Sequence, residues 1–123
     1  MLGQSEFLVA DVIAAAASVS GGIQVNGCHP IRLFMSAGWD AAVITLQESV
    51  DGTTWADLYD NNGAEVTLQA TAGKAIVIPP ALLPGIAWLR VRSGTGATPV
   101  VQSAARTLTW MTKRSEEHTF ELQ

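Results

Sequence analysis

Turn-forming residues recur about every ten positions along this chain and divide it into short apolar segments. The clearest turn lies at 50–54, where Asp51 and Gly52 supply the positive φ angles of a tight hairpin. Asn61, Asn62 and Gly63 mark another turn, and a proline-bounded corner lies at 81–85. This spacing is typical of a β-sandwich or a jelly roll and leaves little room for long helices.

The segments between the turns read as strands. In 41–49, Ala42, Ile44 and Leu46 alternate with residues that face the other way. The sequence therefore predicts an all-β fold, an antiparallel β-sandwich that is jelly-roll-like and has eight or nine short strands. The expected strands are 23–27, 31–36, 41–49, 54–60, 64–70, 74–80, 86–94 and 100–112, with 7–17 as an arm or edge strand and a turn at 28–30.

The chain has 123 residues, which favours one domain with its own core. We expect an N-terminal arm or edge strand at 1–20, the β-sandwich at 21–113 and a non-native tail at 114–123. The tail reads RSEEHTFELQ and closely resembles RSEEHTSELQ, the translation of a common sequencing-library adapter. We therefore interpret it as an assembly scar and assign no function to its His118.

Charge and motif content argue against several classes of function. Only 15% of residues are charged and the net charge is −4, which disfavours a nucleic-acid-binding protein. The apolar stretch 7–19 is interrupted by Asp11 and is too short to span a membrane, so we expect no membrane partner and synthesis in the cytoplasm. Cys28 is the only cysteine, and the adjacent His29 would point to the opposite face of a strand.

No recognisable catalytic motif is present. Aspartates lie in turns, where they hydrogen-bond to their own backbone, and the acidic loop 57–65 lacks EF-hand spacing. We therefore predict no enzyme, with no catalytic, cofactor-binding or metal-binding residue.

Two surfaces are candidates for binding. The apolar segment 7–17 is too hydrophobic to lie loose in water, so we expect an assembly interface formed by Phe7, Leu8, Val9, Val12 and Ile13. In the strand 86–94, Trp88, Arg90 and Arg92 share one face, which would either bind an acidic partner or remain solvated, with arginine stems covering the indole.

The segment SVDGTTW at 49–55 resembles both the Asp-box hairpin of sialidase-like proteins and the hairpin of discoidin-like binding sandwiches. In both, the motif is mainly structural: Asp51 would cap the turn and Trp55 would pack behind it. Four tryptophans are many for this length, and they suit either a core, a subunit interface or a sugar-stacking platform.

Three longer stretches carry a further resemblance. ITLQESVDGTTWADLYDNNGAEV (44–66), AGKAIVIPPALLPGIAWLRVRSGT (72–95) and PVVQSAARTLTW (99–110) are similar to a recurrent small virion protein of tailed bacteriophages. Such proteins include capsid decoration, or cement, proteins, and the resemblance carries no catalytic residue.

The resemblance implies a non-enzymatic virion protein that binds the major capsid protein and itself, with a homotrimer as the expected assembly, and stabilises the head. The alternative is a carbohydrate-binding module of a phage tail or fibre, with a host glycan as its ligand.

Overall fold

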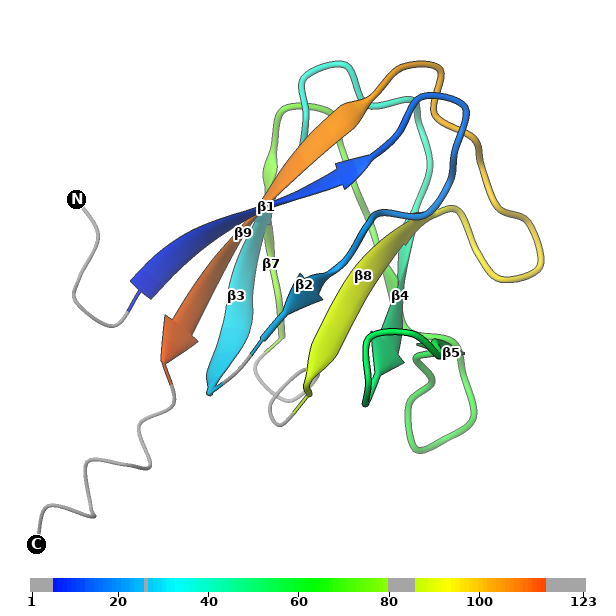
Figure 1. The fold of residues 1–123 in the computed structure, drawn as a ribbon. Helices are drawn as coiled ribbons and strands as arrows, with labels where there is room; N and C mark the ends of the chain where they lie inside the picture. Colours follow the sequence, from blue (N-terminus) through cyan, green and yellow to red (C-terminus); the bar gives the residue numbers. More distant parts are fainter. Residues whose placement is uncertain (1–5, 26, 80–85, 115–123) are drawn as a thin grey trace, which may run out of the picture.

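The computed structural model describes residues 6–25, 27–79 and 86–114, and their strands form two antiparallel sheets packed face to face (Figure 1). The first sheet has the order β1-β9-β3-β7, and the second has the order β2-β8-β4-β5, with β6 also paired to β4. These strands confirm the predicted all-β antiparallel sandwich. Their bounds are β1 Glu6–Ile13, β2 Ile23–Gln24, β3 Cys28–Phe34, β4 Ile44–Ser49, β5 Ala56–Asp57, β6 Thr67–Leu68, β7 Ala75–Val77, β8 Trp88–Ser93 and β9 Arg106–Arg114.

The hydrophobic core lies between the two sheets. The first sheet contributes Leu33, Leu108 and Trp110, and the second contributes Leu46 and Leu89, all without exposed surface. They alternate along their strands with residues that face outward, as a half-buried strand requires. Of the four tryptophans, Trp39 and Trp110 belong to this core, whereas Trp55 and Trp88 are half-buried.

The expected turn at 28–30 is wrong, because these residues form the first part of β3. Cys28 is the partner of Arg114 in β9, and a β-bulge follows between Pro30 and Arg32. A bulge accommodates a proline, which has no N–H to donate to the ladder. The reversal lies one step earlier, at Gly27, which has a φ of 68°.

The N-terminal strand β1 is an edge strand that pairs along its whole length with β9. Beyond Ile13 the chain crosses to the second sheet, where the Ser20 N–H donates to the Val91 carbonyl over 2.8 Å. The next residue, Gly21, still contacts the first sheet, because its N–H donates to the Val12 carbonyl over 3.1 Å. The described part of 1–20 is therefore an edge strand followed by a crossing segment. Of the predicted tail 114–123, only Arg114, the last residue of β9, lies within the described residues.

Candidate functional site

The β8 face that carries Trp88, Arg90 and Arg92 is largely used within the molecule. Arg92 is buried, and its guanidinium donates to Asp57 Oδ1 over 2.9 Å and to Glu65 Oε2 over 2.6 Å. Its Nε also donates to Thr45 Oγ1 over 3.0 Å. The prediction that Arg92 belongs to an exposed face is therefore wrong, because the chain between β4 and β6 folds back over it and surrounds it with carboxylates.

The other two residues of this face also contact the chain's own turns. Arg90 Nε donates to Gln47 Oε1 over 2.6 Å, and its guanidinium lies over the Trp55 ring at 4.4 Å from the centroid. The Trp88 indole packs behind Gly52, so that a Cβ built on this glycine would lie 2.9 Å from Trp88 Cε2. Both side chains are only half-buried, but their main contacts hold the hairpin in place.

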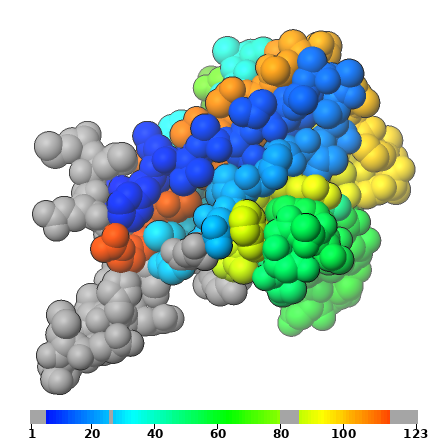
Figure 2. Space-filling model, in the orientation of Figure 1, coloured from blue at the N-terminus to red at the C-terminus, as the bar shows by residue number. Residues whose placement is uncertain are grey.

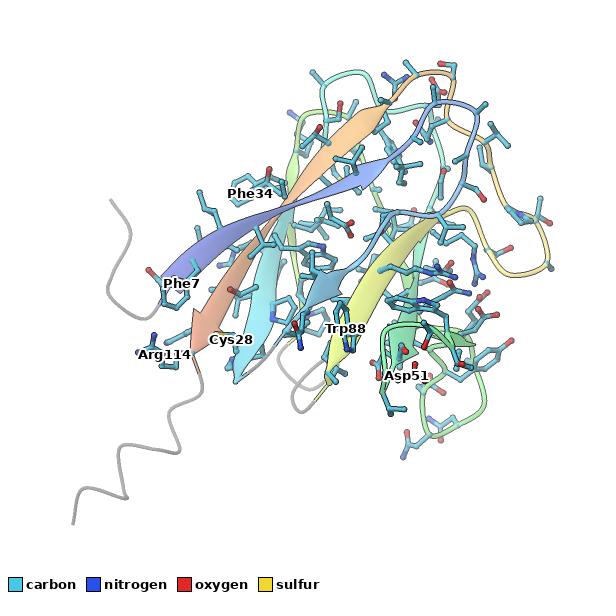
Figure 3. All side chains as sticks on the ribbon, in the orientation of Figure 1. Phe7, Cys28, Phe34, Asp51, Trp88 and Arg114 are labelled. Carbon is cyan, nitrogen blue, oxygen red and sulfur yellow. The ribbon has the colours of Figure 1, made fainter. Side chains whose placement is uncertain are left out.

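The hairpin 49–55 is a self-contained turn. Asp51 Oδ1 accepts from the N–H groups of Thr53 and Thr54, each over 2.9 Å, and the Ser49 hydroxyl donates to the same oxygen over 2.9 Å. Hydrogen bonds from these groups stabilise the charged carboxylate and hold the pKa of Asp51 far below its usual range. The structural interpretation of Asp51 is confirmed, but the indole behind Gly52 belongs to Trp88 rather than to Trp55. Figure 3 labels Trp88 and Asp51 in this part of the molecule.

An open pocket of about 460 Å³ lies beside this hairpin. Its walls include Glu48, Thr54, Trp55, Ile86 and Ala87. Burial raises the pKa of the Glu48 carboxyl, which is the acidic group on this wall. The pocket combines one half-buried aromatic ring with a few polar groups, a composition that suits a small uncharged or sugar-like ligand.

A second surface is the outer face of the four-stranded first sheet, where apolar side chains gather. The ladder places Leu8, Met111, Arg32 and Val77 opposite one another in one row that crosses β1, β9, β3 and β7. In the next row, Phe34 lies between Thr109 and Ala75. Leu8 is 53% exposed, Phe34 40% and Val77 61%. We call Leu8, Val12, Phe34, Val77 and Met111 the outer-face patch.

The patch contains two of the five residues predicted for an assembly interface. Leu8 and Val12 are exposed on the outer face, because alternate residues of β1 point away from the core. The other three point to the opposite side of β1. Ile13 has no exposed surface and belongs to the core, so its assignment to an interface is wrong.

The two remaining residues lie toward the end of the strand. Val9 is half-buried against the core, and Phe7 is 37% exposed, with the Arg114 guanidinium 5.3 Å from the centroid of its ring. Figure 3 shows Phe7 and Arg114 together at this end of the first sheet. Both Phe7 and Val9 line a smaller pocket of about 210 Å³ beside Gln24 and Cys28.

Sequence reasoning did not identify Phe34, Val77 or Met111 as surface residues. Each lies in a strand that was expected, and the alternation of Leu33 with Phe34 was a usable signal. Their assembly into one patch depends on the pairing of strands that are far apart in the sequence, which alternation alone does not give.

Within the described ranges, no three His, Cys, Asp or Glu side chains come together in a way that could hold a metal ion. In the acidic loop, Asp57 and Glu65 bind Arg92, and Asp60 Oδ1 accepts from the N–H groups of Asn62 and Ala64. Cys28 is a half-buried free thiol. No helix in the described part of the chain is long and apolar enough to cross a membrane.

Comparison with protein-family models gives no match to this chain, and a search of curated protein sequences gives none either.

Proposed function

We propose that this chain is a non-enzymatic structural protein of a tailed-bacteriophage virion that binds the outside of the head and stabilises it. The observation that supports this proposal is the outer-face patch, whose apolar side chains lie on the solvent side of a sheet where polar residues are the norm. Arg32 lies between Met111 and Val77 in the same row, so the patch is apolar around one cation. Exposed apolar side chains that gather on one face in this way usually mark a contact with another protein. The phage assignment rests on the sequence resemblance alone.

Such a protein would stabilise the head through the summed contributions of many bound copies. Each copy that lays the patch across a junction between capsid subunits removes apolar surface from water, and many copies act together. Because the hairpin 49–55 is closed by hydrogen bonds of its own and Arg92 is paired with two carboxylates, the domain would dock as a rigid body.

The test uses purified heads of the phage whose genome carries this gene, mixed with the full chain and sedimented. Val77→Lys puts a charge in the outer-face patch, and we expect it to weaken binding by roughly tenfold or more. The matched control is Val50→Lys at the hairpin tip, where the valine is 91% exposed and distant in sequence from the patch. Equal binding by the two variants would contradict docking through the patch, and no binding by the wild type would contradict the head-binding function.

A carbohydrate-binding function on a tail or fibre is the second candidate, and the pocket beside Trp55 is the observation that favours it. Under this candidate a glycan would change the tryptophan fluorescence of the wild type, and Trp55→Ala would abolish the change. A broad glycan panel that leaves the fluorescence of the wild type unchanged would remove this candidate.

A further inference from the structure

Charged residues are distributed unevenly between the two sheets. The strands of the first sheet carry the basic residues Arg32, Arg106, Lys113 and Arg114 and the acidic residues Glu6 and Asp11. Most of the acidic residues within the described ranges lie on the second sheet or in its turns, namely Glu48, Asp51, Asp57, Asp60 and Glu65. Figure 2 shows β1, in dark blue, and the segment around β5, in green, on different sides of the molecule. The first sheet is therefore the more basic side of a chain whose net charge is −4.

Arg32 is the cation that lies within the outer-face patch. It stands between Met111 and Val77 in its row, and Phe34 follows two positions later on the same face of β3. The Arg32 side chain is exposed, and its guanidinium donates to the Ile31 carbonyl over 2.9 Å. Within the described part of the chain it has no carboxylate partner. A guanidinium carries several N–H donors, so most of those on Arg32 are available to another molecule.

The acidic residues of the first sheet do not offset this cation. Glu6 lies directly opposite Lys113 in the β1–β9 ladder, so the base nearest to it in the sheet is on the neighbouring strand. Asp11 points into the sandwich, where it is buried and accepts a hydrogen bond from Ser20. A carboxylate for Arg32 would therefore have to come from another molecule.

We propose that the outer-face patch docks on a protein surface that is apolar around one carboxylate, and that this carboxylate binds Arg32. The inference rests on the proposed head-binding function and specifies the chemistry of the site that the head would offer. Contact with the patch would remove Arg32 from water, and a buried cation without a partner opposes binding. A planar guanidinium can bind a carboxylate through two parallel N–H donors, which makes the contact specific as well as strong.

The composition of the patch favours a carboxylate of a protein over the phosphates of a nucleic acid or a membrane. Nucleic acids and anionic membranes are bound through clusters of cations, whereas this patch contains one cation among apolar side chains. From the sequence, an acidic partner was considered for the β8 face. Because Arg90 and Arg92 are used within the molecule, Arg32 on β3 would bind such a partner instead.

The test compares Arg32→Met with Lys74→Met in the sedimentation assay with purified heads. Both variants replace an exposed cation by an apolar side chain, but Lys74 precedes β7 and lies outside the patch. If a carboxylate faces Arg32, Arg32→Met leaves that carboxylate without its partner, so we expect binding to weaken by roughly tenfold or more. We expect Lys74→Met to bind like the wild type. If the partner surface is apolar alone, Arg32→Met removes a buried cation and strengthens binding, which would overturn the inference.

The behaviour of the wild type separates this inference from the function on which it rests. Heads that bind the wild type and Arg32→Met equally well would leave the head-binding function in place and overturn the carboxylate contact. Heads that do not bind the wild type would overturn both. Wild-type binding to vesicles that contain phosphatidylglycerol, if Arg32→Met abolished it, would show that the patch binds lipid phosphate and would also overturn the inference.

A cross-link keeps the inference testable if Arg32→Met does not fold. A carbodiimide, added to heads that carry the Arg32→Lys variant, joins an amine to a carboxylate in contact with it through an amide bond. We expect mass spectrometry to find position 32 joined to an aspartate or glutamate of a head protein. Lys74 and Lys113 are internal controls for the reaction. Cross-links to the heads from these two lysines but none from position 32 would overturn the inference.

Discussion

Gly52 is the residue on which the hairpin 49–55 depends most directly. Its φ is 81°, a left-handed conformation that side chains disfavour, and the Trp88 indole fills the space where a Cβ would stand. Gly63 has a similar φ of 84°, but nothing lies within 4 Å of its Cβ position. An alanine at either position would strain the backbone, but only at Gly52 would its Cβ also overlap another side chain. Comparing the two substitutions therefore distinguishes the cost of backbone strain from the cost of steric overlap.

We expect Gly52→Ala to lower the free energy of unfolding by about 3 kcal/mol, and Gly63→Ala by about 1 kcal/mol. The larger loss at Gly52 comes from the displacement of Trp88, which then no longer packs against the turn. Urea unfolding followed by circular dichroism would measure both losses. Equal losses would show that Trp88 moves aside freely and that it is not a support for the hairpin.

Asp11 is a buried carboxylate on β1, and it makes the stability depend on pH in an unusual direction. Ser20 Oγ donates to Asp11 Oδ2 over 2.7 Å and the Gly22 N–H donates to Oδ1 over 2.9 Å, but burial outweighs these bonds and raises the pKa of Asp11. The folded state then binds the proton more tightly than the unfolded state, whose pKa is near 3.8. The Asp11 contribution to stability therefore increases as pH falls through the raised pKa and decreases as pH rises.

The measurable quantity is the difference in free energy of unfolding between the wild type and Asp11→Asn. We expect this difference to shift in favour of the wild type between pH 7 and about pH 4. The exposed carboxylates with lowered pKa values, such as Asp51, destabilise both proteins as pH falls, so their effect cancels in the difference. A difference that does not change with pH would mean that Asp11 titrates normally in the folded state.

At the scale of elements, Arg92 joins three parts of the second sheet. It lies on β8 and binds Asp57 on β5 and Glu65, which precedes β6. One side chain therefore anchors both segments that follow β4, the one that contains β5 and the one that leads into β6. The Arg92 side chain is only 8% exposed, and the carboxylate side chains are 33% and 17% exposed. Removing the cation would leave two carboxylates close together without compensation.

We expect Arg92→Ala to lower the free energy of unfolding by about 3 kcal/mol. This value is at the lower end of the range for breaking a buried ion pair, because the Asp57 side chain is 33% exposed. Arg32→Ala, at an exposed position of β3, should change the free energy of unfolding by less than about 0.5 kcal/mol. Thermal or urea unfolding would compare the two. A small decrease in the free energy of unfolding for Arg92→Ala would show that strand pairing alone holds the segments that contain Asp57 and Glu65.

The strands and turns of this protein follow from local rules, and that is why they could be predicted. An Asp-Gly pair is a strong local signal for a hairpin turn, and Asp51 and Gly52 form one here. In the strand 88–93, alternation alone showed that Leu89 and Val91 face away from Arg92. Alternation does not say what covers the outer face of a strand, so burial of Arg92 by the returning chain could not be foreseen. The outer-face patch depends in the same way on register between distant strands. Pairing partners, rather than strand positions, were the missing information.

At the scale of the whole molecule, the question is whether β1 is a detachable arm or part of the folded domain. It pairs with β9 through all eight of its residues, and Ile13 packs without exposed surface in the core with Leu108 and Trp110. A domain without β1 would leave β9 as a new edge and expose one side of the Trp110 ring. Exposing a buried tryptophan lowers the free energy of unfolding by several kcal/mol, which is a large part of the total stability of a domain this small.

We therefore expect deletion of residues 1–13 to abolish cooperative thermal unfolding, as judged by circular dichroism and by the fluorescence of the tryptophans. The control is deletion of residues 115–123, the adapter-like segment, which we expect to leave the unfolding midpoint unchanged because we interpret these residues as an assembly scar. If the protein without residues 1–13 still unfolds cooperatively, β1 is a separable arm and the remaining strands fold without it. If instead removal of 115–123 lowers the midpoint, those residues contribute to the fold and the adapter interpretation fails.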